Sequence, residues 1–292
     1  MKAAICFLTW NRFEYTKKTI EFLLKNTNRD DYELVWWDNF STEEGMLDWI
    51  KKTCIDNKFS YLFFKKNEGL TRAMNNQMRI MDHMRKFDVF CHISNDVIVP
   101  EGWLDGVFEA IKSLKVGAVG LNLEEKITET VLIDGVELEP ICNNGCIGGM
   151  HYCVPKWLYD FLDGKVFKHV SYGYGQQDMN LSVLIKLLPM DVWDYYLPLK
   201  KYKGEEMGKI GSFFTDTIYK DYSQMMGSRL KHSGRDINAG TNYRVKLFSY
   251  RAKYDAGFIT AEQLIEKLKD HDEFLLCDKS QLLETNIAEL IE

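Results

Sequence analysis

The first 93 residues alternate between short apolar runs and longer amphipathic segments, and this alternation constrains the fold more than any other feature. The apolar runs have the length and composition of buried strands and are residues 3–8, 32–38, 61–64 and 89–93. The segments between them carry apolar side chains at helical spacing and are residues 14–25, 42–57 and 70–85. Strands that alternate with helices predict an α/β fold, with a mainly parallel mixed sheet flanked by helices.

Composition excludes several other classes of protein. A chain of 292 residues that is 46% hydrophobic can bury a large core. The net charge of −6 argues against extensive, sequence-independent binding to nucleic acid. The seven cysteines form no CxxC pair, which favours reduced thiols. The sequence also shows no signal-peptide pattern and no apolar stretch of about 18 residues. These features together predict a cytoplasmic protein without stable membrane insertion.

Polar residues follow each of the four predicted strands. They are residues 9–12, 38–42, 67–69 and 94–96. The carboxyl ends of parallel strands meet at one edge of a sheet, where α/β proteins bind their ligands. The last group interrupts an apolar run with Asp96, and an isolated carboxylate is costly to bury. A metal ion is the leading candidate for its compensating partner.

Structural roles compete with ligand binding at several of these positions. Ser41 or Thr42 is also suited to cap a helix, and Gly69 to a turn with an unusual backbone angle. Asp96 also fits a turn at a strand end. Arg72 is equally compatible with a solvent-facing position at the start of a helix. These alternatives remain open at the level of sequence.

Six motifs, in order, connect these strand ends to a known family. They are "FLTWNR", "VWWDNFSTE", "NEGLTRAMNNQ", "ISNDVIVPEGW", "GCIGGMHYCVPKWL" and "YGYGQQDMNLS". Residues 3 to about 188 thereby resemble a family 2-type glycosyltransferase with the GT-A nucleotide-diphosphosugar fold. The resemblance implies a glycosyltransferase domain over residues 1–200, with a donor half at about 1–100 and an acceptor half at about 101–200. Residues 201–292 are expected to form a loop-rich and helical extension packed on that domain.

The resemblance also implies which residues bind the sugar-nucleotide donor, with a UDP-sugar favoured. Asp38 would accept a hydrogen bond from the base or ribose, Arg72 would pair with the pyrophosphate, and Gly69 would allow close backbone approach. The expected donor-binding residues are Thr9, Asn11, Arg12, Asp38, Asn67, Gly69, Arg72, Asn95, Gly148 and Gly149.

A metal site is implied at the strand end that carries Asp96. In the family this turn is an acidic, DxD-like motif that holds Mn²⁺ or Mg²⁺ on the diphosphate, and hard oxygen ligands suit such ions. This chain has Asn95 and Ile98 where further acids would be usual, so a single carboxylate would serve. His232 is the candidate for an additional metal ligand or phosphate contact, with a surface position as its alternative.

The acceptor half carries the expected catalytic base. The motif at residues 173–178 matches a Gly-Tyr-Gly-x-Glu-Asp pattern in which Gln177 replaces the glutamate. Asp178 would take the proton of the acceptor hydroxyl in an inverting reaction, with a helix cap as its alternative role. Tyr174 and Gln177 are expected near the acceptor.

Three functions are consistent with these features. The first is transfer of a sugar from a nucleotide-diphosphate donor to a glycan, lipid-linked or protein acceptor. The second is the same chemistry on a hydroxylated base in DNA. The third is a non-catalytic module that binds a sugar nucleotide or glycan. From about residue 241 the chain is predicted to be helical, and this amphipathic tail either packs on its own domain or mediates a homodimer.

Overall fold

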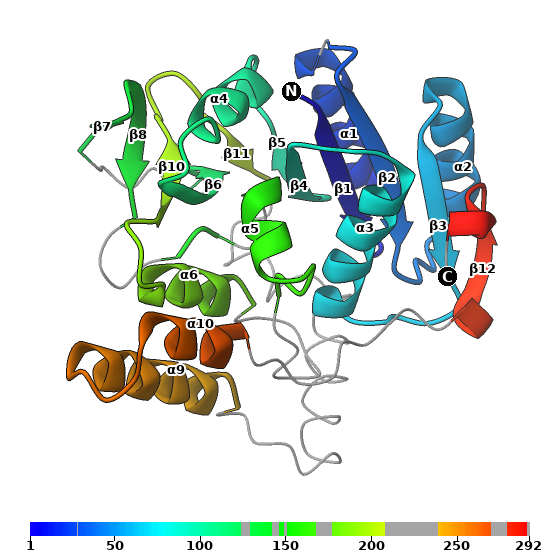
Figure 1. The fold of residues 1–292 in the computed structure, drawn as a ribbon. Coiled ribbons are helices and arrows are strands. Elements are labelled where there is room, and N and C mark those ends of the chain that lie inside the picture. Colours follow the sequence, from blue (N-terminus) through cyan, green and yellow to red (C-terminus); the bar gives the residue numbers. More distant parts are fainter. Residues whose placement is uncertain are drawn as a thin grey trace.

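The computed structural model describes residues 1–27, 29–123, 129–141, 146–148, 151–167, 177–207, 239–269 and 279–290. Within these residues one mixed sheet runs through the molecule (Figure 1). In spatial order its strands are β12 (Leu282–Thr285), β3 (Ser60–Phe64), β2 (Tyr32–Asp38), β1 (Ala3–Thr9), β4 (Val89–Ser94), β9 (His151–Pro155), β6 (Val116–Leu121), β10 (Trp193–Leu197), β8 (Val136–Pro140) and β7 (Val131–Ile133).

The four strands that the sequence predicted form one parallel part of this sheet. Strands β3, β2, β1 and β4 are parallel neighbours, and so are β6 and β10. Strand β9 lies antiparallel between β4 and β6, and β8 and β12 also pair antiparallel with their neighbours. The fold is therefore the expected mixed α/β sheet, with its parallel order concentrated in the first half of the chain.

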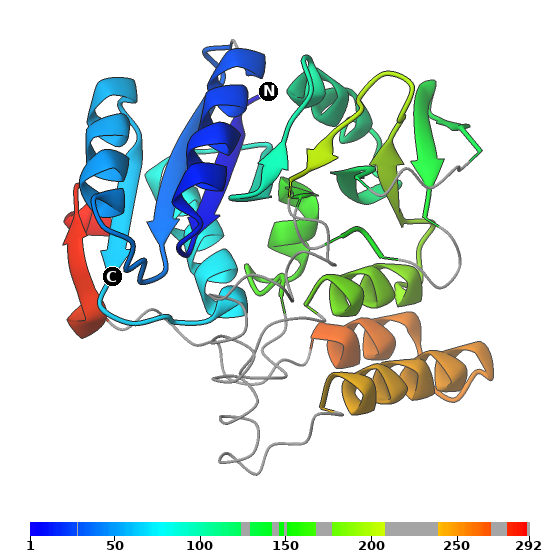
Figure 2. The same cartoon turned by 180° about the vertical axis from the view of Figure 1, so that it is seen from behind.

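Helices cover both faces of the sheet, and the two-residue period of the strands decides which core each side chain enters. On β1, Ile5 and Phe7 face one core, whereas Cys6 and Leu8 face the other. The first core packs against α1 (Phe13–Asn26), α2 (Met46–Asn57) and α4 (Trp103–Ala110). The second packs against α3 (Leu70–Met84), α5 (Lys156–Phe161) and α6 (Gln177–Leu187). Figure 1 shows α3 and α5 in front of the sheet, and Figure 2 shows α1 and α2.

The end of the chain forms two helices and a strand. Helices α9 (Ala239–Asp255) and α10 (Ala261–Lys269) pack together beyond α6, as the helical prediction for this region requires. Beyond them the short 3-10 helices η1 (Lys279–Gln281) and η2 (Ala288–Leu290) flank β12, which the sequence did not predict. This strand adds antiparallel to β3, and the side chain of Asn286 accepts from Tyr61 N at 2.8 Å and donates to Phe59 O at 3.0 Å.

Candidate functional site

The loop after β1 begins the candidate site, and its backbone has an unusual conformation. Asn11 and Arg12 have φ angles of 55° and 63°, in the left-handed region that few residues other than glycine and asparagine adopt readily. The carboxylate of Glu43 accepts hydrogen bonds from the N–H groups of Arg12 and Phe13 at 2.6 and 2.8 Å. Because the first N–H groups of a helix lack helical partners, Glu43 stabilises the start of α1 from the loop after β2.

Asp38 ends β2 and joins the first two loops. Its carboxylate accepts hydrogen bonds from Thr9 Oγ1 at 2.8 Å, from Ser41 N at 2.8 Å and from Ser41 Oγ at 2.5 Å. The Ser41 hydroxyl also accepts from Asn11 N at 2.7 Å. Burial raises the pKa of Asp38, and the bonds from Ser41 and Thr9 oppose that rise. Asp38 is fully buried, so in this conformation it organises the loops, and its expected contact with a base or ribose stays a prediction.

The loop after β3 is tied to the same network. Asn67 Oδ1 accepts from Gly69 N at 2.8 Å and from Asn39 Nδ2 at 2.9 Å, and Asn39 Oδ1 accepts from Glu68 N at 2.8 Å. Gly69 has a φ of 85° with open space where a side chain would begin, so its backbone angle is what favours glycine. Arg72 forms an ion pair with the buried carboxylate of Glu68. Its expected contact with a pyrophosphate stays a prediction.

Asp96, which follows β4, meets Arg12 across the sheet edge. Arg12 Nη1 lies 2.6 Å from Asp96 Oδ2, and the two side chains are only 8% and 4% exposed. Burial raises the pKa of Asp96, and the guanidinium of Arg12 opposes that rise by charge and hydrogen bonding. The buried carboxylate that the sequence singled out is thus compensated by an arginine in this structure.

Asn95 has a structural role in this conformation. Its Nδ2 donates to Asn11 O and to Thr16 Oγ1, both at 2.9 Å. These bonds hold the unusual loop after β1 against the end of β4. The short strand β11 (Glu205–Glu206) pairs with β5 (Val97–Ile98), and Met207 N donates to Asp96 O at 2.9 Å. The chain therefore returns from residue 205 to lie beside the Asp96 turn.

The donor set at Asp96 fits a divalent ion that shares its coordination with a phosphate ligand. Among the described residues no group of three or more His, Cys, Asp or Glu side chains gathers as a metal cluster. Mg²⁺ commonly uses one or two protein carboxylates, with substrate phosphates and waters completing its coordination. One carboxylate is therefore sufficient for an ion held jointly with a diphosphate, provided that Arg12 releases Asp96.

The acceptor side is described only in part. Gly148 is half-buried beside the buried Ile147. Asp178 lies in the first turn of α6, where its Oδ1 accepts from Met179 N at 2.8 Å. Of the other predicted residues, Gly149, Tyr174 and His232 lie outside the described residues, and for Gln177 only its place at the start of α6 is described.

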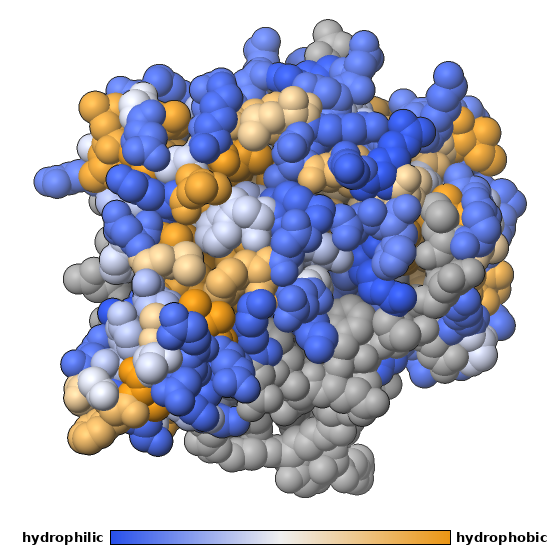
Figure 3. Space-filling model, in the orientation of Figure 1, coloured by the Kyte–Doolittle hydropathy of each residue, from blue (hydrophilic) through white to orange (hydrophobic). Residues whose placement is uncertain are grey.

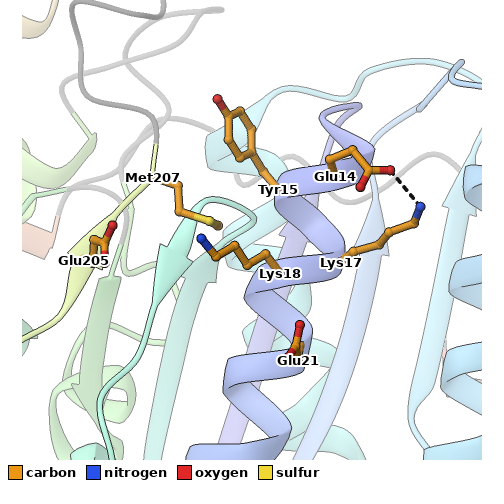
Figure 4. A pocket seen from close by; sticks show the side chains of 7 residues that line it. All are labelled: Glu14, Tyr15, Lys17, Lys18, Glu21, Glu205 and Met207. Atoms are coloured by element: carbon orange, nitrogen blue, oxygen red, sulfur yellow. Dashed lines mark hydrogen bonds and ion pairs between the residues drawn. The ribbon is translucent and has the colours of Figure 1, made fainter.

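A groove of about 570 Å³ opens beside the Asp96 turn, between α1 and β11. Glu14, Tyr15, Lys17, Lys18, Glu21, Glu205 and Met207 line it. Figure 4 shows the ammonium group of Lys18 directed toward Met207, while Lys17 pairs with Glu14 on the outer side of α1. The guanidinium carbon of Arg12 lies 4.9 Å from the centroid of the Tyr15 ring, so the groove borders the Arg12–Asp96 pair.

The sequence reasoning missed several residues that build this site. The side chains of Glu43 and Asn39 bind neighbouring loops, whereas the carboxylate of Glu68 pairs with Arg72 in the helix that follows its own loop. Asn39 and Glu68 are each next to a predicted donor-binding residue, and Glu43 is five residues from Asp38; this proximity is the only signal that the sequence offers. The partners of Glu43 and Asn39 are 31 and 28 residues away along the chain, and spacing alone does not reveal such pairs.

The family model for glycosyl transferase family 2 matches residues 4–161, more than half of the chain. The chain belongs to glycosyl transferase family 2. The matched segment contains the whole donor-side network from Thr9 to Asp96 and ends within α5. A search of curated proteins found no match.

Solved structures of glycosyltransferases share the fold. GalNAc-T7 with UDP, GalNAc and Mn²⁺ superimposes with a TM-score of 0.53 at 10% identity, over 92% of this chain and 55% of that one. Mannosyltransferase PcManGT from Pyrobaculum calidifontis, in complex with GDP-Man and Mn²⁺, superimposes with a TM-score of 0.51 at 14% sequence identity. The match covers 91% of this chain and 72% of that one. S. aureus TarS 1–349 with UDP-GlcNAc superimposes with a TM-score of 0.52 at 13% sequence identity, and the match covers 90% of this chain and 78% of that one.

These likenesses establish the GT-A fold of the chain. The protein spans about half of the GalNAc-T7 chain, and a TarS match covers 61% of its chain. At such identities a shared fold does not transfer the substrate from one protein to another.

Proposed function

We propose that the protein transfers a sugar from a nucleotide-diphosphate donor, with a UDP-sugar favoured, to an acceptor hydroxyl in a metal-dependent, inverting reaction. The observation that carries the proposal is the meeting of Arg12 and Asp96 at the carboxyl edge of the sheet, inside the segment that matches the family. A cation and a carboxylate there can bind a diphosphate and its counter-ion. The Mn²⁺ in the GalNAc-T7 and PcManGT structures supports the same reading.

On the donor side, the loops after β1, β2 and β3 supply the binding surface. Asn11 and Arg12 present backbone and side chain at the edge of the sheet, and Asp38 fixes their loop through Ser41. In the proposed complex Arg12 leaves Asp96 and pairs with a phosphate oxygen, because a guanidinium binds phosphate in a two-pronged geometry. Asp96, freed of its partner, would hold the divalent ion.

The leaving group is a nucleoside diphosphate that gains negative charge as the bond to the sugar breaks. A Mn²⁺ or Mg²⁺ ion bound through Asp96 would supply Lewis-acid stabilisation of that charge. Arg12 would contribute a second positive charge on the same group.

On the acceptor side, Asp178 would act as the general base. The acceptor oxygen forms a bond to C1 of the sugar while the C1–oxygen bond to the diphosphate breaks, and the electron pair leaves with the diphosphate. The acceptor proton passes to a carboxylate oxygen of Asp178. Its place in the first turn of α6 anchors it through Leu181, Leu184 and Ile185, which are buried as predicted.

A thermal-shift series tests the donor part of the proposal. The protein is heated with UDP, GDP, CDP or dTDP, each with and without Mn²⁺ or Mg²⁺. Since a ligand that binds only the folded state raises the apparent stability, we expect one nucleotide to shift the melting temperature only when the metal is present. Asp96→Asn should abolish that metal-dependent shift.

Asp88→Asn is the matched control, because Asp88 precedes the same strand at its opposite end and accepts from Lys2 N. A metal-dependent shift that survives in Asp96→Asn would refute the role of Asp96. If a nucleotide sugar binds but neither transfer nor hydrolysis releases nucleoside diphosphate, the non-catalytic module becomes the better description. Glycan, lipid-linked, protein and hydroxymethylated-DNA acceptors are then compared by the release of nucleoside diphosphate.

A further inference from the structure

Phe40, in the loop after β2, combines an unfavourable backbone conformation with an exposed position. Its φ angle is 76°, in the left-handed region that a residue with a bulky side chain rarely adopts. Phe40 is 41% exposed, whereas its neighbours Asn39 and Ser41 are 4% and 7% exposed. The loop therefore buries two polar residues and presents the aromatic residue between them to solvent.

Exposed apolar residues occur in several parts of the described chain. Figure 3 shows orange areas at several places on the face that it draws, with blue residues between them. None of the described helices is long and apolar enough to cross a membrane. Single exposed apolar residues are normal on protein surfaces, so exposure alone does not indicate a site. Phe40 differs from the others in its backbone, because it is the only large apolar residue with a positive φ among those that the structure describes.

The hydrogen bonds of its neighbours impose this conformation on Phe40. On one side, Asn39 N donates to Thr9 O at 2.8 Å, and the Asn39 side chain bonds to the loop after β3. On the other side, Ser41 donates to the carboxylate of Asp38 through both its N–H group and its hydroxyl. Backbone strain persists only where surrounding contacts fix it, and strained residues concentrate at active sites and ligand-binding sites.

The ring of Phe40 takes no part in the packing of the described chain. It belongs to neither of the two cores, and no ring contact joins it to another described residue. Asp38, two residues earlier, is fully buried and already accepts three hydrogen bonds. The side chain that this strand end offers to a ligand is therefore the ring of Phe40.

The position of Phe40 relative to the Arg12–Asp96 pair suits a nucleotide. Asp96 follows β4 and Phe40 follows β2, and β1 lies between these two strands (Figure 1). Two strand spacings amount to about 10 Å along the edge of the sheet. In a nucleoside diphosphate, the ribose bridges a gap of this kind between the base and the diphosphate. A nucleotide whose diphosphate lies at the Arg12–Asp96 pair can therefore bring its base to the loop after β2.

We propose that the ring of Phe40 stacks on the base of the nucleotide donor. This inference rests on the proposed function, since the base is the flat aromatic part of that donor. Stacking on an aromatic ring contributes affinity for every base, because every base has a π-face. Phe40 thus supplies binding energy for the nucleotide, and the preference for one base over another comes from polar groups elsewhere in the site.

Calorimetric titration in Mn²⁺ tests the stacking without requiring turnover. The full chain is titrated with UDP, GDP, CDP and dTDP, and with inorganic pyrophosphate, which has no base. Phe40→Gly should weaken each nucleotide that binds by about tenfold, and by a similar factor for each of them. Phe40→Tyr, which keeps an aromatic ring, should bind nucleotides like the unchanged protein. Pyrophosphate should bind all three proteins equally.

Phe40→Gly also separates stacking from stability. Glycine adopts a positive φ without strain, so the melting temperature should be equal to or higher than that of the unchanged protein although nucleotide affinity falls. Lys58→Gly is the matched control, because Lys58 has a φ of 57° at the end of α2, just before the amino end of β3 and so opposite the candidate site. It should relieve strain in the same way and leave nucleotide affinity unchanged.

Three results would overturn the stacking role of Phe40. They are equal nucleotide affinity in Phe40→Gly and the unchanged protein, an equal loss of affinity for pyrophosphate, and an effect confined to the KM of the acceptor. If no nucleotide binds the unchanged protein, the proposed function fails together with this inference. If nucleotides bind but Phe40→Gly has no effect on them, only this inference fails.

Discussion

The guanidinium of Arg12 lies 2.6 Å from the carboxylate of Asp96, and both side chains are almost completely buried. Removal of one partner from a buried pair leaves an uncompensated charge, whereas a substrate that binds both partners can replace the pair at little cost. The two residues are therefore poised to separate when a diphosphate and a cation arrive together. Binding of either ligand alone must break the pair without full compensation.

This relationship predicts that the metal and the nucleotide bind cooperatively. Calorimetric titration with Mn²⁺ should show affinity that rises about tenfold or more when the preferred nucleoside diphosphate is present. Arg12→Gln should bind Mn²⁺ more tightly than the unchanged protein in the absence of nucleotide, and should lose most of the cooperativity. It should also be less stable by about 3 kcal/mol at neutral pH. Independent binding of the two ligands to the unchanged protein would contradict the prediction.

Asp178→Asn separates binding from transfer. The amide cannot take a proton, so kcat should fall by about 10²- to 10⁴-fold while the affinity for the nucleotide stays the same. Product release is followed in steady-state assays, and nucleotide affinity by titration. Asp160→Asn is the control, since that exposed aspartate on α5 pairs with Lys156. Undiminished turnover in Asp178→Asn would rule out the proposed base.

Ser41→Ala tests the network that orders the donor loops. The change deprives Asp38 of its shortest hydrogen bond and leaves Asn11 N without its acceptor, so the free energy of unfolding should fall by about 1–3 kcal/mol. Nucleotide affinity should fall as well. Thr19→Val is the contrast, because its hydroxyl is buried on α1 and has no hydrogen-bond partner among the residues that the structure describes, so we expect a neutral or stabilising effect. Denaturant unfolding measures the free energy of unfolding of both variants. Equal losses of stability in Ser41→Ala and Thr19→Val would contradict the role of Ser41 in ordering the donor loops.

His92 and His151 predict sensitivity to acid. Burial lowers the pKa of each to about 3, and the charge of His92 further disfavours protonation of His151. The ordinary pKa of a histidine is 6.5. Between about pH 3 and pH 6.5 the unfolded chain therefore binds more protons at these two residues than the folded chain does. Stability should therefore fall as the pH drops below about 6.5, by up to about 1.4 kcal/mol per pH unit for each histidine.

Melting temperatures between pH 7.5 and 4.5 measure this dependence. His92→Asn or His151→Asn should flatten the curve, because the variant has one fewer group to protonate on unfolding. His83→Asn should leave the curve unchanged, since His83 is exposed on α3. A curve that stays equally steep in both core variants would show that other groups cause the acid sensitivity.

The sequence was most informative where local pattern and long-range packing agree. The first four strands were predictable because each is a buried run between amphipathic helices, and Leu181 and Leu184 revealed the inner face of α6 in the same way. Helix α2 was predicted from residue 42 but begins at Met46, because Ser41 and Glu43 bind Asp38 and the start of α1 rather than capping their own helix. The contact of Glu43 with Arg12 spans 31 residues of the chain, so local spacing could not reveal it.

The same limit explains Asp96 and Asn95. Their spacing predicted a strand end with a compensated carboxylate, which is what the structure shows. It could not reveal that Arg12 supplies the compensation, or that the Asn95 amide holds the loop after β1. Both partners lie 84 residues earlier in the chain.

The pairing of β12 with β3 has a consequence for how the chain matures. Residues 282–285 close the open edge of a strand made more than 200 residues earlier. Until residues 282–285 have been synthesised, the backbone N–H and C=O groups on that edge of β3 lack their partners from β12. An unpaired strand edge can form hydrogen bonds with strands of other chains and so cause aggregation. A chain that lacks residues 282–285 would expose this edge of β3, so β12 protects the sheet against aggregation.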